Sequence, residues 1–258
     1  MTTVALEVLD GVAHLTLDRP DARNAVSLEL ARDLHEATSQ LPGDQAVRVV
    51  LLRGRGDNFC AGGDLKEFSA HPDMSAHLRE VTSYLHPAID NLDQLHAPVV
   101  VAVRGAAAGA GLGLACSADI VLASTTARFV SAYTKIGLTP DGSTSWWLPR
   151  IVGLRRALEL TLTNRMLDAD EAVAWGIATR VVDDERLDEE AEALASELAS
   201  GPTSAYAGAR RLLRDSFGCS LEEHMGAEQE TLVRSASHAN AREGIAAFLE
   251  KRAPHFDK

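Results

Sequence analysis

The chain has 258 residues, of which 46% are hydrophobic, so it is long enough to bury one substantial core. Its net charge of -12 argues against nucleic acid as a partner, because phosphate binding depends on lysine and arginine. We expect a cytoplasmic protein that does not bind membranes, since the sequence shows no apolar stretch of roughly 20 residues, no basic leader and only three scattered cysteines.

The N-terminal part of the sequence predicts a hairpin, a helix and a buried strand. Residues 4–8 and 12–17 alternate apolar and polar side chains around Asp10-Gly11, which is a strong hairpin signal. Ser27 is a favourable N-cap for the helical pattern that follows it. Residues 47–52, VRVVLL, are typical of a strand that is buried on both faces.

The middle of the chain continues the alternation of helix and strand patterns. Residues 68–95 are compatible with helix, and Pro72 and Pro87 are expected to interrupt it. Further apolar runs predict strands at 99–103, 119–123, 127–130 and 177–182. Asp168 and Glu171 have the spacing of a capping box at the start of a helix. This alternation predicts an α/β core.

The pattern changes near the C-terminus, where only helices are predicted. Three segments carry apolar residues at helical spacing: 186–199, 202–215 and 221–249. We therefore divide the chain into a core of residues 1–200, expected to hold the functional site, and a helical segment of residues 201–258. Because the last helices cannot bury their apolar faces alone, we expect them to pack on the core of their own chain or on a neighbouring chain, and we assign the segment to oligomerisation.

One supersecondary unit occurs twice in the sequence. The strands at 47–52 and 99–103 both end in Arg-Gly, and each leads to a turn rich in glycine and alanine, at 60–65 and 105–113. Two such turns side by side could each direct one backbone N–H at the same oxygen, which stabilises the enolate of an acyl group. For either turn alone, close packing of a helix on the sheet is the competing explanation.

Five stretches, in order, resemble the enoyl-CoA hydratase/isomerase (crotonase) family. They are LDRPDARNAVS at 17–27, FCAGGDLKEF at 59–68, RGAAAGAGLGLACSADIVLA at 104–123, IGLTPDGSTSWWLPRIVG at 136–153 and REGIAAFLEKRAPHF at 242–256. The resemblance covers essentially the whole chain. It implies a crotonase-like spiral of ββα units with a C-terminal helical trimerisation segment, a coenzyme A thioester as substrate, and homotrimers or dimers of trimers.

The resemblance also implies which residues form the site. The backbone N–H groups of Gly63 and Ala110 would form the oxyanion hole. The implied substrate-binding residues are Arg23, Ala25, Ala61, Gly62, Asp64, Leu65, Lys66, Gly109, Leu138, Phe248 and Lys251. Of these, Phe248 and Lys251 are candidates for a neighbouring subunit's site. A solvated surface charge is the alternative role for Lys66 and Lys251.

Asp141 is the candidate acid/base. Pro-Asp-Gly is by itself a turn signal, but the resemblance makes Asp141 similar to the single carboxylate of family isomerases that move a double bond or rearrange a ring epoxide, the latter in phenylacetate degradation. The two glutamates of the family's hydratases would align with Gly113 and Tyr133, so ordinary hydration is not expected. Leu138, Trp146 and Trp147 flank Asp141, which suggests that desolvation raises its pKa.

Two alternatives to an isomerase stay open from the sequence. The chain could be a hydratase, or catalyse another reaction of the family with a different base. It could also be a catalytically weak protein of this fold that binds acyl-CoA.

No separate cofactor is expected, because coenzyme A is part of the substrate thioester. No metal is expected either, because the nine histidines form no cluster with metal-ligand spacing.

Overall fold

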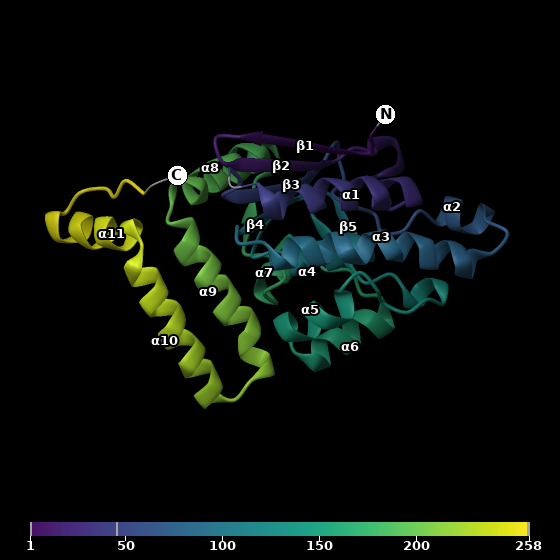
Figure 1. The fold of residues 1–258 in the computed structure, drawn as a ribbon. Helices are drawn as coiled ribbons and strands as arrows, with labels where there is room; N and C mark the ends of the chain where they lie inside the picture. Colours follow the sequence, from purple (N-terminus) through teal and green to yellow (C-terminus); the bar gives the residue numbers. More distant parts are fainter. Residues whose placement is uncertain (1, 45, 257–258) are drawn as a thin grey trace.

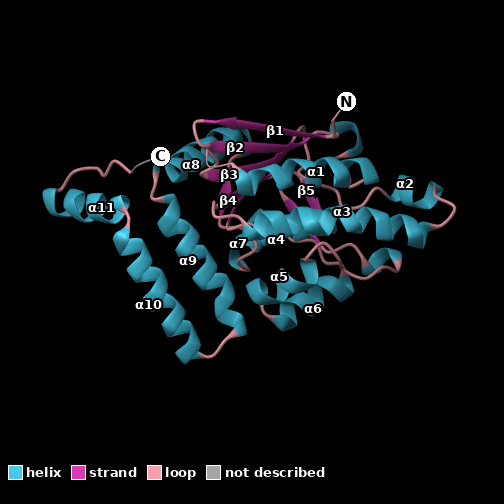
Figure 2. Ribbon diagram, viewed as in Figure 1, coloured by secondary structure: helices cyan, strands magenta, loops and turns pink. Residues whose placement is uncertain are grey.

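A six-stranded sheet forms the centre of the protein in the computed structural model, which describes residues 2–44 and 46–256 (Figures 1 and 2). The strands lie in the order β1 (Val4–Leu9), β2 (Val12–Leu17), β3 (Val49–Gly54), β4 (Val99–Val103), β6 (Ile120–Ser124) and β8 (Arg180–Val182). All neighbours are parallel except the β1–β2 hairpin. A second, two-stranded parallel sheet pairs β5 (Ala106–Ala108) with β7 (Arg128–Val130). The predicted α/β class is confirmed.

Helices cover both faces of the main sheet. The helices of the core are α1 (Leu28–Gln40), α2 (Leu65–Ala70), α3 (Met74–Gln94), α4 (Ala110–Ser117), α5 (Thr144–Val152), α6 (Leu154–Thr163), α7 (Ala169–Ala174) and α8 (Leu187–Ser200). Alternate residues of β3 point to opposite faces, so Val50 and Leu52 join the cluster with α1 and α3, whereas Val49 and Leu51 pack against α8. The predicted two-sided burial of the strand at 47–52, which is β3, is therefore confirmed.

Local signals that depend on a few residues predicted the turns and caps well. Asp10 and Gly11 have φ angles of 48° and 87° between paired strands, as a tight hairpin turn requires. The Ser27 hydroxyl accepts a hydrogen bond from the Leu30 amide and caps α1. The capping box of Asp168 and Glu171 is also present.

The prediction for one of the two prolines was wrong. Pro72 does separate α2 from α3, but Pro87 lies inside the continuous helix α3. Proline removes one hydrogen bond from a helix. Packing against α1 along a stripe of buried residues, including Leu85, Ala88 and Leu92, holds the helix together around it.

Three C-terminal helices extend away from the core (Figure 1). They are α9 (Thr203–Asp215), α10 (Leu221–Ser237) and α11 (Ala239–Glu250), so the single helical segment expected over 221–249 is interrupted at His238. Ion pairs of Arg210 and Arg214 with Asp119, at 2.7 and 2.8 Å, tie α9 to the core.

No helix within residues 2–44 and 46–256 has the length and apolarity to cross a membrane.

Two of the three cysteines are buried, and we expect them to be unreactive. Burial raises the pKa of Cys60 to about 11 and that of Cys116 to about 12, whereas Cys219 is exposed. Because the thiolate is the reactive form, both buried thiols stay protonated at neutral pH. A chromogenic disulfide reagent should therefore titrate one thiol per native chain and three after denaturation in guanidinium. Rapid titration of three native thiols would contradict the burial.

Candidate active site

The two glycine-rich turns lie side by side. Cys60, after β3, pairs with β5: its amide donates to the Ala106 carbonyl at 2.9 Å, and its carbonyl accepts from the Ala108 amide at 3.0 Å. Gly62, with φ of +92°, lies so close to the second turn that a Cβ there would be 3.0 Å from the Ala108 carbonyl oxygen. A glycine is thus needed for the turns to touch.

Two free backbone N–H groups result from this contact. Gly63 lies in the first turn, and Ala110 is the first residue of α4. Within residues 2–44 and 46–256, neither amide donates a backbone hydrogen bond. Gly109 presents the Ala110 amide through a conformation, φ 52° and ψ -118°, that side chains disfavour. Both donors border the same cavity, where the N-terminus of α4 adds partial positive charge.

That cavity has a volume of about 430 Å³ and is mainly apolar. It is lined by Val26, Ala61, Gly62, Gly63, Leu65, Phe68, Leu78, Val81, Thr82, Leu85, Gly109, Ala110, Ala132, Tyr133, Lys135, Ile136, Leu138, Thr139 and Asp141. The turns form one wall, α2 and α3 a second, and residues 132–141 a third. A small-molecule site typically has this composition, with an apolar enclosure and a few polar groups.

Asp141 is the one carboxylic acid among the described residues that line the cavity. Its Oδ2 lies 3.6 Å from Nε2 of His86 on α3. The Tyr133 hydroxyl donates to the Asp141 backbone carbonyl at 3.2 Å. Burial, followed by the negative charge of Asp141, raises the pKa of Tyr133 above its usual range, so this phenol is a neutral hydrogen-bond donor at physiological pH.

The expected apolar shielding of Asp141 is only partly present. Leu138 lines the cavity with Asp141, but Trp146 and Trp147 line a second cavity together with His86 and Ser143. The Asp141 side chain is 34% exposed in the chain. Nearness to Asp141 in sequence therefore does not bring Trp146 and Trp147 to the acyl cavity.

Backbone occupies the space around Gly113. A Cβ at Gly113 would lie 2.1 Å from the Gly142 carbonyl oxygen and 2.8 Å from Oγ1 of Thr144. Helix α4 therefore packs directly on the loop that carries Asp141. The position aligned with a hydratase glutamate has no room for any side chain.

We expect Gly113→Ala to lower the free energy of unfolding by about 2 kcal/mol, because the added methyl meets backbone that must move. Urea denaturation measures this. Gly226→Ala in α10 is the matched control, since nothing lies within 4 Å of its Cβ position, and it should stabilise the helix by about 0.5–1 kcal/mol. If Gly113→Ala were as stable as the wild type, the close packing would be refuted.

The structure brings the N-terminal loop that carries Arg23 and Ala25 to the first turn. The Ala61 amide donates to the Arg23 carbonyl at 3.0 Å, and the Val26 amide donates to the Gly62 carbonyl at 2.7 Å. This places Arg23 and Ala25 beside Ala61 and Gly62, and the Arg23 side chain is exposed. The Asp64 carboxylate already has two partners, because it caps α2 and pairs with Arg19 at 3.0 Å.

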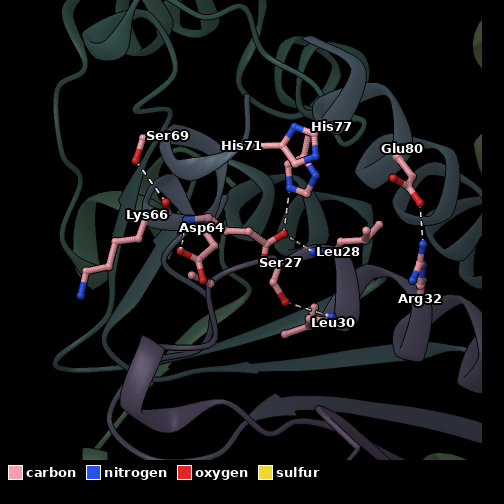
Figure 3. Close-up of polar contacts among 12 residues, drawn as sticks. Ser27, Leu28, Leu30, Arg32, Asp64, Lys66, Ser69, His71, His77 and Glu80 are labelled. Carbon is pink, nitrogen blue, oxygen red and sulfur yellow. Dashed lines mark hydrogen bonds and ion pairs between the residues drawn. The ribbon is translucent and has the colours of Figure 1, made fainter. Parts of the chain in front are cut away.

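A polar cluster around the buried His77 was not predicted from the sequence (Figure 3). The Glu67 carboxylate accepts from the Leu28 amide at 2.9 Å and lies 2.8 Å from Nε2 of His77. The His77 ring stacks on His71 with 4.6 Å between centroids. These contacts join α1, α2 and α3. Lys66, also on α2, is exposed and extends away from the cluster.

Phe248 and Lys251 do not reach the cavity of their own chain. Both belong to the end of α11, which lies on the opposite side of the molecule from α2 (Figure 1), and neither lines the cavity. The Phe248 side chain is 84% exposed. Their contribution to a neighbouring subunit's site stays a prediction.

Among the described residues, no three His, Cys, Asp or Glu side chains are grouped so that they could hold a metal ion.

Comparison with known proteins shows the family of the chain. The family model described as enoyl-CoA hydratase/isomerase matches residues 7–258. The chain is 38% identical to 1,2-epoxyphenylacetyl-CoA isomerase of Escherichia coli, over 99% of this chain and 98% of the relative. It is 36% identical to a probable enoyl-CoA hydratase of Rhodobacter capsulatus, over 98% and 97% of the two chains.

A solved structure extends this likeness to the fold. The crystal structure of a Mycobacterium abscessus protein, described as an enoyl-CoA hydratase/isomerase, superimposes with a TM-score of 0.95 at 37% identity, covering 98% of this chain and 99% of the other. With the family model matching nearly the whole chain, this confirms the predicted crotonase-like fold. The protein belongs to the enoyl-CoA hydratase/isomerase family.

Proposed function

We propose that the protein is an acyl-CoA isomerase that converts a 3-enoyl thioester into a 2-enoyl thioester, or rearranges a ring-epoxide acyl-CoA, through a thioester enolate. One observation carries the proposal. Among the residues that the structure describes, a single carboxylate, Asp141, shares an apolar cavity with the amides of Gly63 and Ala110, which donate no backbone hydrogen bond.

The proposed double-bond shift needs only these groups. The thioester oxygen accepts hydrogen bonds from the Gly63 and Ala110 amides. Asp141 takes a proton from C2, and the electron pair of that C–H bond forms a dienolate whose oxygen the two amides stabilise. Asp141 then returns a proton to C4, which leaves the double bond between C2 and C3. The reaction is redox-neutral, so no cofactor beyond the coenzyme A of the substrate is needed.

Two features favour isomerisation over hydration. Hydration adds a water molecule, so one group must deprotonate the water at one end of the double bond and a group must protonate the other end. Asp141 is the one carboxylic acid in the cavity among the described residues. The packing at Gly113 excludes a second carboxylate there.

The E. coli relative supports the ring-epoxide variant, because its name states isomerisation of an epoxyphenylacetyl thioester. On this reading, the protein acts in phenylacetate degradation.

For coenzyme A binding, we propose the exposed Arg23 and the buried Ala25 beside it, with Ala61, Gly62 and Leu65 forming the entrance to the cavity and the exposed Lys66 available to a phosphate. We further propose a homotrimer or a dimer of trimers in the cytoplasm. Large apolar side chains are exposed on the outer helices, including Leu154, Leu162, Leu213, Leu232, Phe248 and Leu249. Their burial between chains would bring Phe248 and Lys251 to a neighbouring site.

The test of the proposed function compares two assays on the purified protein. A 3-enoyl-CoA is supplied, and formation of the conjugated 2-enoyl-CoA is followed by absorbance. Crotonyl-CoA is supplied in parallel, and loss of absorbance reports hydration. Isomerisation without hydration is the expected result. Efficient hydration would refute the single-carboxylate mechanism, and tight thioester binding with no turnover would favour a binding protein.

A further inference from the structure

A second cavity, also of about 430 Å³, lies near Asp141, because one of its lining residues, His86, is 3.6 Å from the Asp141 carboxylate. It is lined by His86, Ile89, Asp90, Asp93, Ser143, Trp146 and Trp147. Its walls come from α3 and the start of α5, and it shares no lining residue with the acyl cavity. The proposed reaction assigns it no role.

His86 connects the two cavities. It lines the second cavity, and its Nε2 lies 3.6 Å from the Asp141 carboxylate, which lines the first. Its side chain is 53% exposed, so it also meets solvent. At 3.6 Å the two atoms are just beyond hydrogen-bond distance, so a small side-chain rotation completes a hydrogen bond to Asp141. Histidine is the side chain best suited to accept and release a proton near neutral pH.

We infer that His86 is a proton relay, a positioning residue that lets the proton held by Asp141 exchange with solvent through the second cavity. This inference rests on the proposed function in one respect: Asp141 must take up a substrate proton. While the dienolate exists, the protonated Asp141 passes its proton to the lone pair of Nε2 in neutral His86. The imidazolium releases a proton to water in the second cavity, and the reverse steps deliver a solvent proton to Asp141.

The charges around His86 are compatible with such a transient imidazolium. Asp141 faces it from the loop before α5, and Asp90 and Asp93 line the same cavity from α3. Asp93 is engaged by Arg214 of α9, and Arg150 of α5 stacks on Trp146, 3.4 Å from the ring centroid. His86 therefore shares its cavity with two carboxylates and lies 3.6 Å from a third, while Arg150 and Arg214 are engaged by other groups.

Isotope transfer tests the relay directly. A 3-enoyl-CoA is isomerised in D₂O, and mass spectrometry of the product at low conversion gives deuterium at C4 per turnover. Without exchange, Asp141 returns the hydrogen it removed, and the product carries no deuterium. We expect the wild type to incorporate deuterium and His86→Gln to lower the incorporation per turnover about tenfold. His96→Gln is the matched control, because His96 is an exposed histidine that lines neither cavity.

A second substrate separates failure of the relay from failure of the proposed function. Exchange of the α-hydrogens of phenylacetyl-CoA with D₂O requires proton abstraction but no double-bond shift. If this exchange occurs in the wild type and falls about tenfold in His86→Gln, the relay holds even without isomerase turnover. The relay is overturned if the wild type and His86→Gln exchange hydrogen equally per turnover. It is also overturned if the wild type returns every hydrogen that it removes from the substrate, or if it removes none.

Discussion

Asp141→Asn should lower kcat for isomerisation by about 10³-fold, because general acid–base catalysis contributes roughly 10²- to 10⁴-fold and no other carboxylate lines the cavity among the described residues. The asparagine amide keeps the size of the side chain but cannot accept the C2 proton. Binding of the thioester should persist, because the Gly63 and Ala110 amides and the apolar walls are untouched. The measurement is kcat with a 3-enoyl-CoA, together with the Kd of a saturated acyl-CoA by calorimetry.

The control for this variant is Asp170→Asn on α7, an exposed carboxylate that lines neither cavity. This substitution also removes one negative charge, and it should leave kcat and Kd unchanged. An effect seen only in Asp141→Asn is then not due to the loss of charge alone. Loss of thioester binding in Asp141→Asn would show that the substitution disturbs the cavity rather than the chemistry. Full activity with intact binding would mean that another group is the base.

The candidate site could be predicted where a few adjacent residues decide the geometry. Gly62 and Gly109 both have positive φ angles, and the Gly/Ala pattern shows that backbone can approach closely there. Likewise, the caps at Ser27 and Asp168 depend on residues within one helical turn. Such signals survive in the sequence because their partners are neighbours in the chain.

What could not be predicted depends on contacts between distant segments. His86 comes to Asp141 because α3 packs on α1 and remains continuous through Pro87. No short-range pattern marks that approach, and proline by itself favours a break. The exclusion of a side chain at Gly113 similarly depends on where the loop before α5 places the Gly142 carbonyl. Both features needed the folded structure.

The proposed oxyanion hole can be tested through Gly109→Ala, which changes no side chain that takes part in the proposed reaction. The backbone at Gly109, φ 52° and ψ -118°, is unfavourable for alanine, so the turn should relax and redirect the Ala110 amide. Loss of one oxyanion donor typically lowers kcat by about 10²- to 10³-fold, and we expect a loss of that size. There is room for the methyl group, since the nearest atom to its position is 3.6 Å away. The expected loss is therefore conformational in origin.

Gly153→Ala separates this effect from general backbone strain. Gly153 also has a conformation that disfavours alanine, φ 81° and ψ 153°, with nothing within 4 Å of its Cβ position, but it lies between α5 and α6. Both variants should lose about 1–3 kcal/mol of unfolding free energy from strain, measured by urea denaturation. Only Gly109→Ala should also lose turnover. Equal losses of kcat in the two variants would remove the Ala110 amide from the mechanism, because destabilisation alone would then explain the result.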